Sequence, residues 1–380
     1  MIYKDFKGLK LSALGMGAMR LPVKDGRDSQ IDQEETEKMV DYAMKNGVNY
    51  YDTAWGYHEG NSEIVMGEAL GRYPRESFFL ADKFPGYDLS NMDKVQPIFE
   101  KQLEKCGVEY FDFYLFHNVC EMNIDAYLDK SHGIMEYLLE QKKAGRIRHL
   151  GFSLHGGCQV LERFLAAYGD EMEFCQIQLN YMDWDFQKAK DKLDILNSRN
   201  IPVWVMEPLR GGQLASLDER YAERLKKLRA DETMPAWAFR FLQSLPGVTV
   251  TLSGMSDFRQ MKENIETFRE EKPLNKEEME ALTHIADDMI KKIALPCTAC
   301  RYCTSHCPQH LDIPRLLELY NEHCSTKMGF IAPMALAAID EDKRPDACIG
   351  CRSCEAVCPQ QIKISEAMAD FVKRLGQPAV

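Results

Sequence analysis

Four side chains capable of acid–base chemistry lie at the ends of three apolar segments of the chain. Asp52 closes the first segment and Tyr57 follows five residues later, so a carboxylate and a phenol share one turn. Lys83 and His117 end the second and third segments. If the segments are neighbouring strands of a parallel sheet, their C-terminal ends place all four side chains around one crevice. For Asp52 and Tyr57 taken alone, a helix cap and a packed aromatic ring are the alternative.

These four residue types together can assist the reduction of a carbonyl group by hydride. A salt bridge with Asp52 would keep Lys83 charged, and that charge would pull the pKa of the Tyr57 phenol below its free value of about 10. Tyr57 would then act as a general acid. His117 would hydrogen-bond the carbonyl oxygen and polarise it while hydride arrives at the carbon.

The segments that carry these residues alternate with helical patterns. Residues 48–63 predict a strand, a glycine-containing turn and a helix capped at Asn61-Ser62. The other predicted strands are 11–21, 77–83, 110–117, 147–154, 174–181, 203–206 and 248–252. Eight strands with intervening helices indicate an α/β protein with a (β/α)₈ TIM barrel of about 250 residues. A doubly wound open sheet is the alternative, disfavoured because no G-x-G-x-x-G pattern follows the first strand.

The motif Asp52-Thr53-Ala54-x-x-Tyr57, followed by Lys83 and His117 at strand ends, resembles the catalytic tetrad of the aldo-keto reductases. The resemblance covers residues 1–290. It implies a nicotinamide-dependent oxidoreductase that interconverts aldehydes or ketones with alcohols. Asp52, Tyr57, Lys83 and His117 are then the expected catalytic residues.

The resemblance also implies a nicotinamide cofactor extended across the barrel mouth. Gly17 lies in the turn beside the cofactor, and Ser153 and Gln176 match positions that hydrogen-bond the carboxamide. The other matched positions are Met206 at the nicotinamide ring, Glu207, Leu209 and Gly212 near the pyrophosphate, and Asn264 at the adenine. The chain departs from the family pattern at Leu154, where an Asn is typical, and at Met206, where many members stack a Tyr. A thioether can cover a ring face, although less rigidly.

The adenosine end departs further from the family pattern. Gly254-Met255 stands in place of the basic pair that grips a 2′-phosphate, and Gln260 in place of an arginine. Arg259 could replace that arginine, or the helix N-terminus near Ser256 and Asp257 could meet the ribose. The expected cofactor is NADP, with NAD as the alternative.

A second module follows a charged final helix and a boundary at Leu295-Pro296. Residues 297–308 and 348–359 both read C-x₂-C-x₂-C-x₃-C-P. This spacing is typical of two [4Fe-4S] clusters in which the fourth cysteine of each run ligates the other cluster. The predicted ligand sets are Cys297, Cys300, Cys303 with Cys358, and Cys348, Cys351, Cys354 with Cys307. Zinc ligands and disulfides are the alternatives.

The segment between the two cysteine runs has apolar residues at helical spacing, and residues 296–375 are similar to the helical dicluster ferredoxin-like domains of dehydrogenase electron-transfer subunits. The five other cysteines are expected to be ordinary buried thiols, namely Cys106, Cys120, Cys158, Cys175 and Cys324. For Cys120, just past His117, a role in the substrate loop is the alternative.

Composition bounds the remaining possibilities. The chain has 380 residues, 45% of them hydrophobic, which is enough for two domains. Its net charge of −12 argues against a nucleic-acid partner. We find no long apolar run, and therefore expect no signal peptide, no membrane span and a cytoplasmic location.

Three classes of function remain open at this stage. The first is a carbonyl reductase whose clusters exchange electrons with an external carrier, such as a ferredoxin or a flavoprotein. The second is the same enzyme with clusters that brace the fold or sense oxygen. The third is an electron-transfer adaptor with an inactive barrel. The carbonyl substrate is not determined, but the loops 84–91 and 118–133 are expected to set it. Trp55, Tyr87 and Trp184 could line an aromatic mouth, with ordinary packing of an exposed Trp as the alternative.

Overall fold

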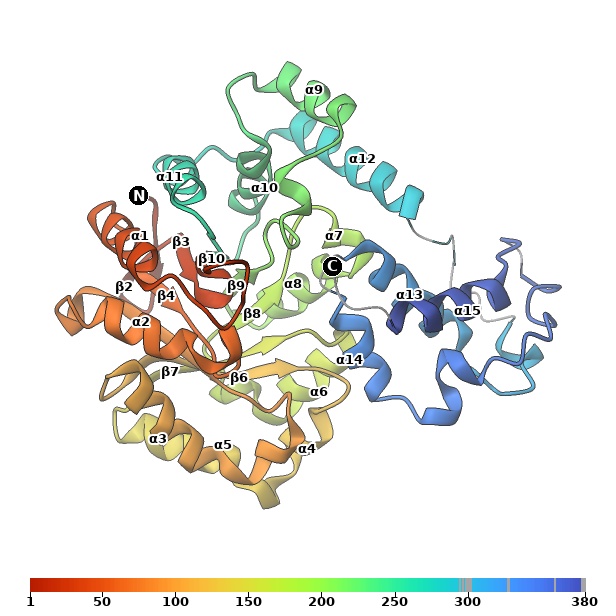
Figure 1. Cartoon of the computed structure of the whole chain (residues 1–380), viewed down its shortest axis with the longest axis horizontal. Coiled ribbons are helices and arrows are strands. Elements are labelled where there is room, and N and C mark those ends of the chain that lie inside the picture. The colour runs from red at the N-terminus through yellow and green to blue at the C-terminus, as the bar shows by residue number, and fades with distance from the viewer. Residues whose placement is uncertain (294, 296, 298–302, 327–328, 359, 377–380) are drawn as a thin grey trace. The chain divides into compact units, whose positions relative to one another are not determined.

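The computed structural model describes residues 1–293, 295, 297, 303–326, 329–358 and 360–376. The chain divides into two compact units, Met1–Glu280 and Ala281–Val380 (Figure 1). This division falls inside the helix α12 (Lys276–Ile293). The domain ranges 1–290 and 296–375 stay predictions. No helix in the described residues is long and apolar enough to cross a membrane.

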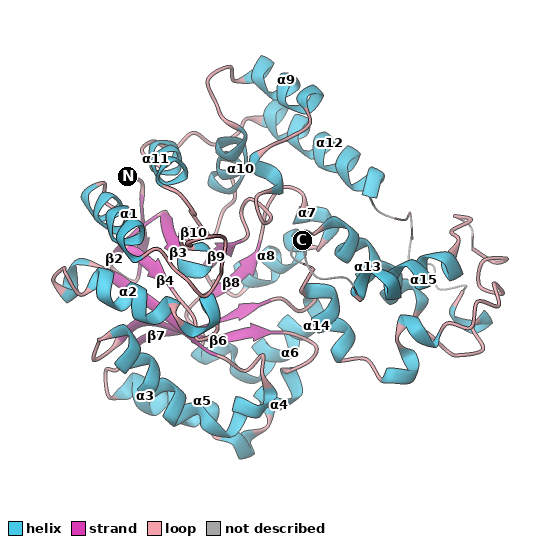
Figure 2. Ribbon diagram, in the orientation of Figure 1, coloured by secondary structure: helices cyan, strands magenta, loops and turns pink. Residues whose placement is uncertain are grey.

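The first unit is a closed barrel of parallel strands (Figure 2). In barrel order its strands are β3 (Leu14–Gly17), β4 (Tyr50–Asp52), β5 (Phe79–Phe84), β6 (Phe111–Val119), β7 (Ile147–Leu154), β8 (Cys175–Gln178), β9 (Val203–Met206) and β10 (Val248–Ser253). β10 pairs with β3 and closes the ring. The predicted TIM barrel is confirmed, and the open sheet is wrong.

The predicted first strand, 11–21, is divided in the structure. Its first residues belong to an antiparallel hairpin of β1 (Tyr3–Phe6) and β2 (Leu9–Ser12), and β3 begins after Ala13. Phe6 of this hairpin packs among rings at the end of the barrel where the strands begin, against Phe113, Phe174 and Trp204. The hairpin therefore fills one end of the barrel, and the C-terminal ends of the strands stay available for a site.

Helices surround the barrel in the order that the alternating pattern predicts (Figure 1). They are α1 (Gln33–Lys45), α2 (Ser62–Leu70), α3 (Val95–Cys106), α4 (Ile124–Leu128), α5 (Ile134–Lys143), α6 (Cys158–Tyr168), α7 (Asp183–Phe186), α8 (Ala189–Ser198), α9 (Glu219–Leu228), α10 (Met234–Gln243) and α11 (Phe258–Thr267). α2 begins at Ser62, as expected. However, the Asn61 amide donates to carbonyls of Ser29 and His58 instead of capping the helix.

The second unit is mostly helical in its described residues, in agreement with the sequence prediction. Its main helices are α13 (Ile313–Ser325), α14 (Ile331–Ala337) and α15 (Ile364–Leu375). Leu316, Leu317 and Phe371 form part of its small apolar core, and the cysteines Cys303 and Cys354 are buried in the same cluster. The core thus brings residues of both cysteine runs together.

Glu173 ties the base of the barrel together. Its carboxylate accepts hydrogen bonds from Lys7 of the hairpin turn (2.6 Å) and His149 of β7 (2.9 Å), and it pairs with Lys142 of α5 (2.7 Å). Burial by itself would raise the pKa of Glu173, but the hydrogen bonds from His149, Lys142 and Lys7 lower it far below its usual range. The Leu150 N–H of β7 also donates to this carboxylate, so Glu173 holds the hairpin, β7 and α5 together.

We expect Glu173→Gln to lower the free energy of unfolding by about 1–3 kcal/mol at neutral pH. The pKa of Glu173 is lower in the folded chain, so its pairs stabilise above the unfolded pKa of about 4.3, and the stabilisation is lost as pH falls towards the folded value. Urea unfolding at several pH values checks this. The exposed partner of Lys4, Glu271, provides the control variant Glu271→Gln, which should change little. An equal loss in both variants would contradict the prediction.

Candidate functional site

A buried ion pair joins the ends of two neighbouring strands. Asp52 ends β4 and Lys83 lies near the end of β5, and both side chains are almost completely buried. The Lys83 Nζ lies 2.6 Å from the Asp52 Oδ1 and 2.6 Å from the Thr53 carbonyl oxygen. β4 and β5 pair in parallel register, so the barrel holds the two residues together across a separation of 31 positions.

Tyr57 and His117 lie against this pair. Tyr57 begins the short helix η2 (Tyr57–Gly60), and the Lys83 Nζ is 5.0 Å from the centre of its ring. His117 comes from β6, the strand next to β5, and its ring meets the Tyr57 ring edge-on with centroids 6.0 Å apart. The His117 ring also meets the Tyr87 ring edge-on, with centroids 5.2 Å apart. The four predicted catalytic side chains are therefore brought together, with Tyr87 as an additional neighbour.

Burial decides the protonation states of the site. It lowers the pKa of Lys83, but Asp52, Tyr57 and Asp82 together raise that pKa above its ordinary value. Burial and then the Lys83 charge lower the pKa of His117 well below its usual range, so His117 is neutral near pH 7. Burial also raises the pKa of Asp52 against the effect of Lys83.

The expected lowering of the Tyr57 pKa is wrong. Lys83 does act in the lowering direction, but burial of the phenol is the larger effect and raises the pKa above 10. The Asp52 carboxylate, which sequence reasoning treated only as the partner of Lys83, also raises it. Lys83 therefore offsets part of the burial effect on the phenol without overcoming it.

The turn that presents Tyr57 is strained and held by a residue that sequence analysis missed. His58 and Glu59 adopt left-handed backbone angles, with φ of 52° and 55°. The buried His58 ring accepts the Leu21 N–H at Nε2 (3.0 Å), and its Nδ1 lies 2.8 Å from the Asp28 carbonyl oxygen. These contacts fix the Nδ1–H tautomer and tie the β3–α1 loop to the Tyr57 turn. Position next to Tyr57 is the only sequence signal for His58.

Two of the predicted nicotinamide contacts lie side by side. Ser153 of β7 and Gln176 of β8 are partners in the parallel ladder, and both are buried. The Ser153 Oγ accepts the Asn118 N–H at 2.7 Å and keeps its own hydrogen to donate. The Gln176 Oε1 is buried and, among the described residues, meets no hydrogen-bond donor. A donor hydroxyl beside an unsatisfied carbonyl fits a carboxamide, which has one acceptor and two donor hydrogens.

The remaining predicted cofactor residues line the same rim. Gly17 ends β3, and a Cβ there would meet the Ser253 carbonyl oxygen at 3.6 Å. Met206 ends β9 and is partly exposed, as is Leu209, while Gly212 has a φ of 91° in the following turn. The buried Asn264 amide donates to the Ser253 Oγ at 3.1 Å.

Arg20 is a further residue that sequence analysis missed. Its guanidinium pairs with the Glu207 carboxylate at 3.3 Å, and a Cβ at Gly254 would approach its side chain to 3.1 Å. The contact joins the ends of β3, β9 and β10. Glu207 is therefore engaged by Arg20 and by the Gly211 N–H. A glycine at 254 leaves the space that the Arg20 side chain fills.

The first turn of α11 is partly occupied by its own residues. Asp257 caps the helix by accepting the Gln260 N–H, and the Gln260 side chain accepts the Ser256 N–H. The Arg259 side chain is 73% exposed and forms a helical ion pair with Glu263 at 3.3 Å. Arg259 therefore presents an exposed guanidinium at this turn, whereas Ser256 and Asp257, predicted as the alternative contact to the ribose, are engaged by Gln260.

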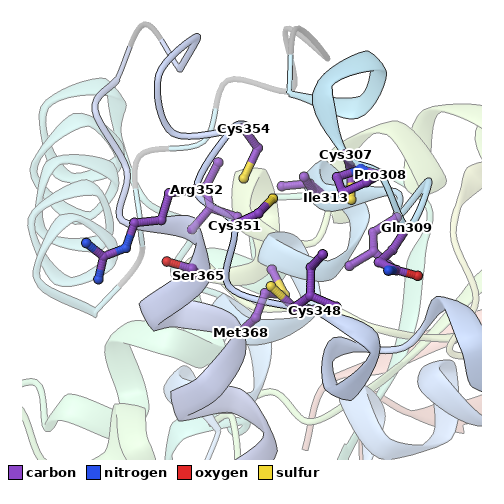
Figure 3. Close-up of a pocket in the computed structure, with 13 residues that line it drawn as sticks. Cys307, Pro308, Gln309, Ile313, Cys348, Cys351, Arg352, Cys354, Ser365 and Met368 are labelled. Carbon is purple, nitrogen blue, oxygen red and sulfur yellow. The ribbon is translucent and has the colours of Figure 1, made fainter.

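The cysteine runs form a pocket in the second unit. Cys307, Cys348, Cys351 and Cys354 line one pocket together with Ile313 and Met368 (Figure 3). One cysteine of the first run and three of the second therefore line one pocket, which is the set predicted for one cluster. Cysteine thiolates are the usual ligands of an iron–sulfur cube, but among the described residues no three cysteines, histidines or acids are arranged to hold a metal ion. Of the other predicted set, Cys297, Cys303 and Cys358 are described, and Cys300 lies outside the described residues.

The other cysteines lie outside this pocket. Cys106, Cys120 and Cys175 are buried, and Cys158 and Cys324 are partly buried. Burial raises the pKa of the Cys120 thiol to about 11, which makes it a poor nucleophile. Their interpretation as ordinary packed thiols agrees with these positions.

A family model described as aldo/keto reductase matches residues 13–287, and a 4Fe-4S dicluster domain matches residues 296–363. The first match spans well over half of the chain. The chain belongs to the aldo-keto reductase family. Its barrel is therefore that of an oxidoreductase family, and it is followed by an iron–sulfur domain.

Two relatives of this aldo-keto reductase are each identical to it at about a quarter of the aligned positions. YqkF, an oxidoreductase of Bacillus subtilis, is 24% identical over 315 residues, which cover 74% of this chain and 95% of the relative. The NADH-specific methylglyoxal reductase of Escherichia coli is 24% identical over 54% of this chain and 66% of its own length.

Solved structures agree with the fold. The holo form of an aldo-keto reductase from Bacillus halodurans has a TM-score of 0.60 at 22% identity, over 73% of this chain and 93% of its own. An aldo-keto reductase from Klebsiella pneumoniae in complex with NADPH has a TM-score of 0.59 at 17% identity, over 75% of this chain and 96% of its own.

We expect Lys83→Met to reduce turnover by roughly 10²-fold or more and to shift its pH profile. The substitution removes the cation beside the phenol and leaves the Asp52 carboxylate buried without its partner. Turnover measured across pH checks this. Lys101→Met, at an exposed lysine on α3, is the control and should leave the profile unchanged. An unaltered profile in Lys83→Met would contradict the assignment.

Proposed function

We propose that the chain is a nicotinamide-dependent oxidoreductase that interconverts aldehydes or ketones with alcohols. The observation that carries this proposal is the buried Lys83–Asp52 pair beside the Tyr57 phenol, with His117 facing that phenol. A proton donor next to a cation, together with a neutral imidazole, suits carbonyl reduction. Small-molecule carbonyl compounds are the proposed substrates, and Tyr87, in ring contact with His117, is the proposed wall beside them.

Each of the four residues has one role in this proposal. Tyr57 donates its proton to the carbonyl oxygen and takes a proton back when the alcohol is oxidised. Lys83 stabilises the phenolate that remains, and Asp52 keeps Lys83 charged. The neutral His117 donates a hydrogen bond to the same oxygen and orients it. When bound, the nicotinamide supplies or accepts the hydride.

The carboxamide of the nicotinamide would be held by Ser153 and Gln176. The Ser153 hydroxyl can donate to the amide oxygen, and the buried Gln176 Oε1 can accept an amide hydrogen. We propose NADP, with NAD as the alternative, because the exposed Arg259 can reach a phosphate. Similar proteins include both an NADPH complex and an NADH-specific reductase.

The second unit would hold two [4Fe-4S] clusters that exchange electrons with an external one-electron carrier, a ferredoxin or a flavoprotein. The pocket lined by Cys307, Cys348, Cys351 and Cys354 supports one of the crossed ligand sets. Clusters that brace the fold or sense oxygen are the second candidate. A cytoplasmic, reducing location is part of the proposal, because the cysteines must stay available as thiolates.

We expect Tyr57→Phe to leave cofactor binding nearly intact and to lower turnover by about 10²-fold or more, because the proton donor is lost. Nicotinamide oxidation with a panel of aldehydes and ketones measures turnover, and fluorescence titration measures cofactor binding. Tyr42→Phe, at a helix position outside the site, is the control. Turnover that survives in Tyr57→Phe would contradict the catalytic assignment.

We expect Cys351→Ser to lower the iron content below two clusters per chain while carbonyl reduction persists. Electron exchange with a one-electron carrier should be lost, because one cube loses a ligand and the crossed cysteines loosen the other. Cys324→Ser, at a cysteine outside both runs, should keep both activities.

Loss of both activities in Cys351→Ser would mean that the clusters support the barrel or take part in its turnover. Loss of neither would leave the clusters without an electron-transfer role. Circular dichroism confirms that each variant is folded.

A further inference from the structure

Two buried carboxyl groups lie behind Lys83, on the outer side of β5. Successive side chains of a strand point to opposite faces, so Asp82 faces α2 and α3 while Lys83 faces the site. Asp82 and Glu63 of α2 are both completely buried. Neither has a role in the reaction described above.

A single glutamine amide joins the two carboxyl groups. The Gln102 Nε2 lies 2.8 Å from the Asp82 Oδ1 and 3.0 Å from the Glu63 Oε1. The Gln102 Oε1 accepts the Tyr114 hydroxyl hydrogen at 2.6 Å, which orients the amide with its NH₂ towards the acids. Asp82 also accepts the backbone N–H of Lys83 at 2.8 Å, so it contacts the residue whose ammonium group lies beside the Tyr57 phenol.

The charges around this pair do not balance if both acids are ionised. Lys105 of α3 contacts the Glu63 Oε2. The Lys83 ammonium is bound to Asp52 and Thr53 on the other face. Cys106 is a further titratable neighbour, with its Sγ 3.9 Å from the Asp82 Oδ2. The phenols of Tyr57, Tyr87 and Tyr114 also interact with one or both acids. Two buried acids thus share one cation.

Burial and then the charge of Glu63 raise the pKa of Asp82 well above its ordinary value. Burial and the neighbouring acids raise the pKa of the Cys106 thiol as well, so that thiol is neutral and adds no charge. Tyr114 is neutral for the same reason. An acid pair with one cation is electrically neutral when it holds one proton.

We propose that Asp82 and Glu63 share one proton, and that the neutral Asp82 is a positioning residue that keeps Tyr57 able to release its proton. This proposal rests on the proposed carbonyl reduction. Glu63 and Lys105 form the charged pair, and Asp82 donates its proton towards Glu63 while it accepts the Lys83 N–H.

The physical reason is the charge that forms during the reaction. Proton donation leaves a phenolate at Tyr57, which Lys83 stabilises. An ionised Asp82 would place a second negative charge behind Lys83 and raise the Tyr57 pKa. In a buried site such charges interact strongly, because little water screens them. If Asp82 is neutral, the Lys83 charge interacts mainly with the Asp52 carboxylate and the Tyr57 phenolate.

Three variants test the shared proton through the pH profile of alcohol oxidation, in which Tyr57 must be deprotonated. Asp82→Asn keeps the group neutral, able to donate to Glu63 and accept from Lys83, and should retain the wild-type profile. Glu63→Gln leaves Lys105 without its partner, so Asp82 should ionise. The profile should then move to higher pH by about one unit, the usual size of a like-charge effect. The double variant Asp82→Asn with Glu63→Gln should lack this shift to higher pH, because no carboxylate can form behind Lys83.

An unshifted profile in Glu63→Gln, or an equal shift in Asp82→Asn, would overturn the proposal. Infrared difference spectroscopy tests the proton without turnover. The wild-type protein should show the band of a buried protonated carboxyl group near neutral pH, lost in Asp82→Asn and retained in Asp52→Asn. Absence of this band in wild type would overturn the proposal even if Asp82→Asn failed to fold. A protein with the band but no activity on any carbonyl would count against the proposed function instead.

Discussion

The ion pair between Lys83 and Asp52 is the interaction on which the candidate site depends. A buried ammonium is tolerated only with a close acceptor, and the Asp52 carboxylate and the Thr53 carbonyl both lie 2.6 Å from it. These acceptors come from β4 and the residue after it, so they meet Lys83 only because β4 and β5 pair in the barrel. Barrel closure and site chemistry are thus linked: the strand pairing that completes the core also supplies the counter-charge.

Polar groups near this ion pair lie on two sides of β5, some in the barrel mouth and some behind the strand. Inside the barrel mouth, Tyr57 and the neutral His117 face Lys83, where a substrate oxygen can receive hydrogen bonds. Behind β5, the polar groups face one another and are satisfied by Gln102 and Lys105. The strand alternation alone produces this separation, because neighbouring residues of β5 point to opposite sides. β5 therefore contributes Lys83 to the candidate site and Asp82 to the buried hydrogen-bond network behind it.

The two units of the chain suit different electron chemistry. In the proposed function the barrel moves two electrons as hydride, whereas each cluster moves one. The second unit has a small apolar core, in which Cys303 and Cys354 are packed with Leu316, Leu317 and Phe371. A core of this size is typical of domains that gain stability from bound metal. Ligands drawn from both cysteine runs would link the ends of that unit.

The sequence alone determined the barrel, the cysteine spacing and the order of the four acid–base residues, because strand periodicity and motif spacing are local properties. It could not determine the hydrogen bonds of His58 to Leu21 and Asp28, the Arg20–Glu207 contact or the Asp82–Glu63 pair, since each joins residues far apart in the chain. It also gave the wrong direction for the Tyr57 pKa. A sequence shows which charges are present, but the balance between burial and Lys83 depends on how deeply the packed barrel encloses the phenol, and only the tertiary structure decides that.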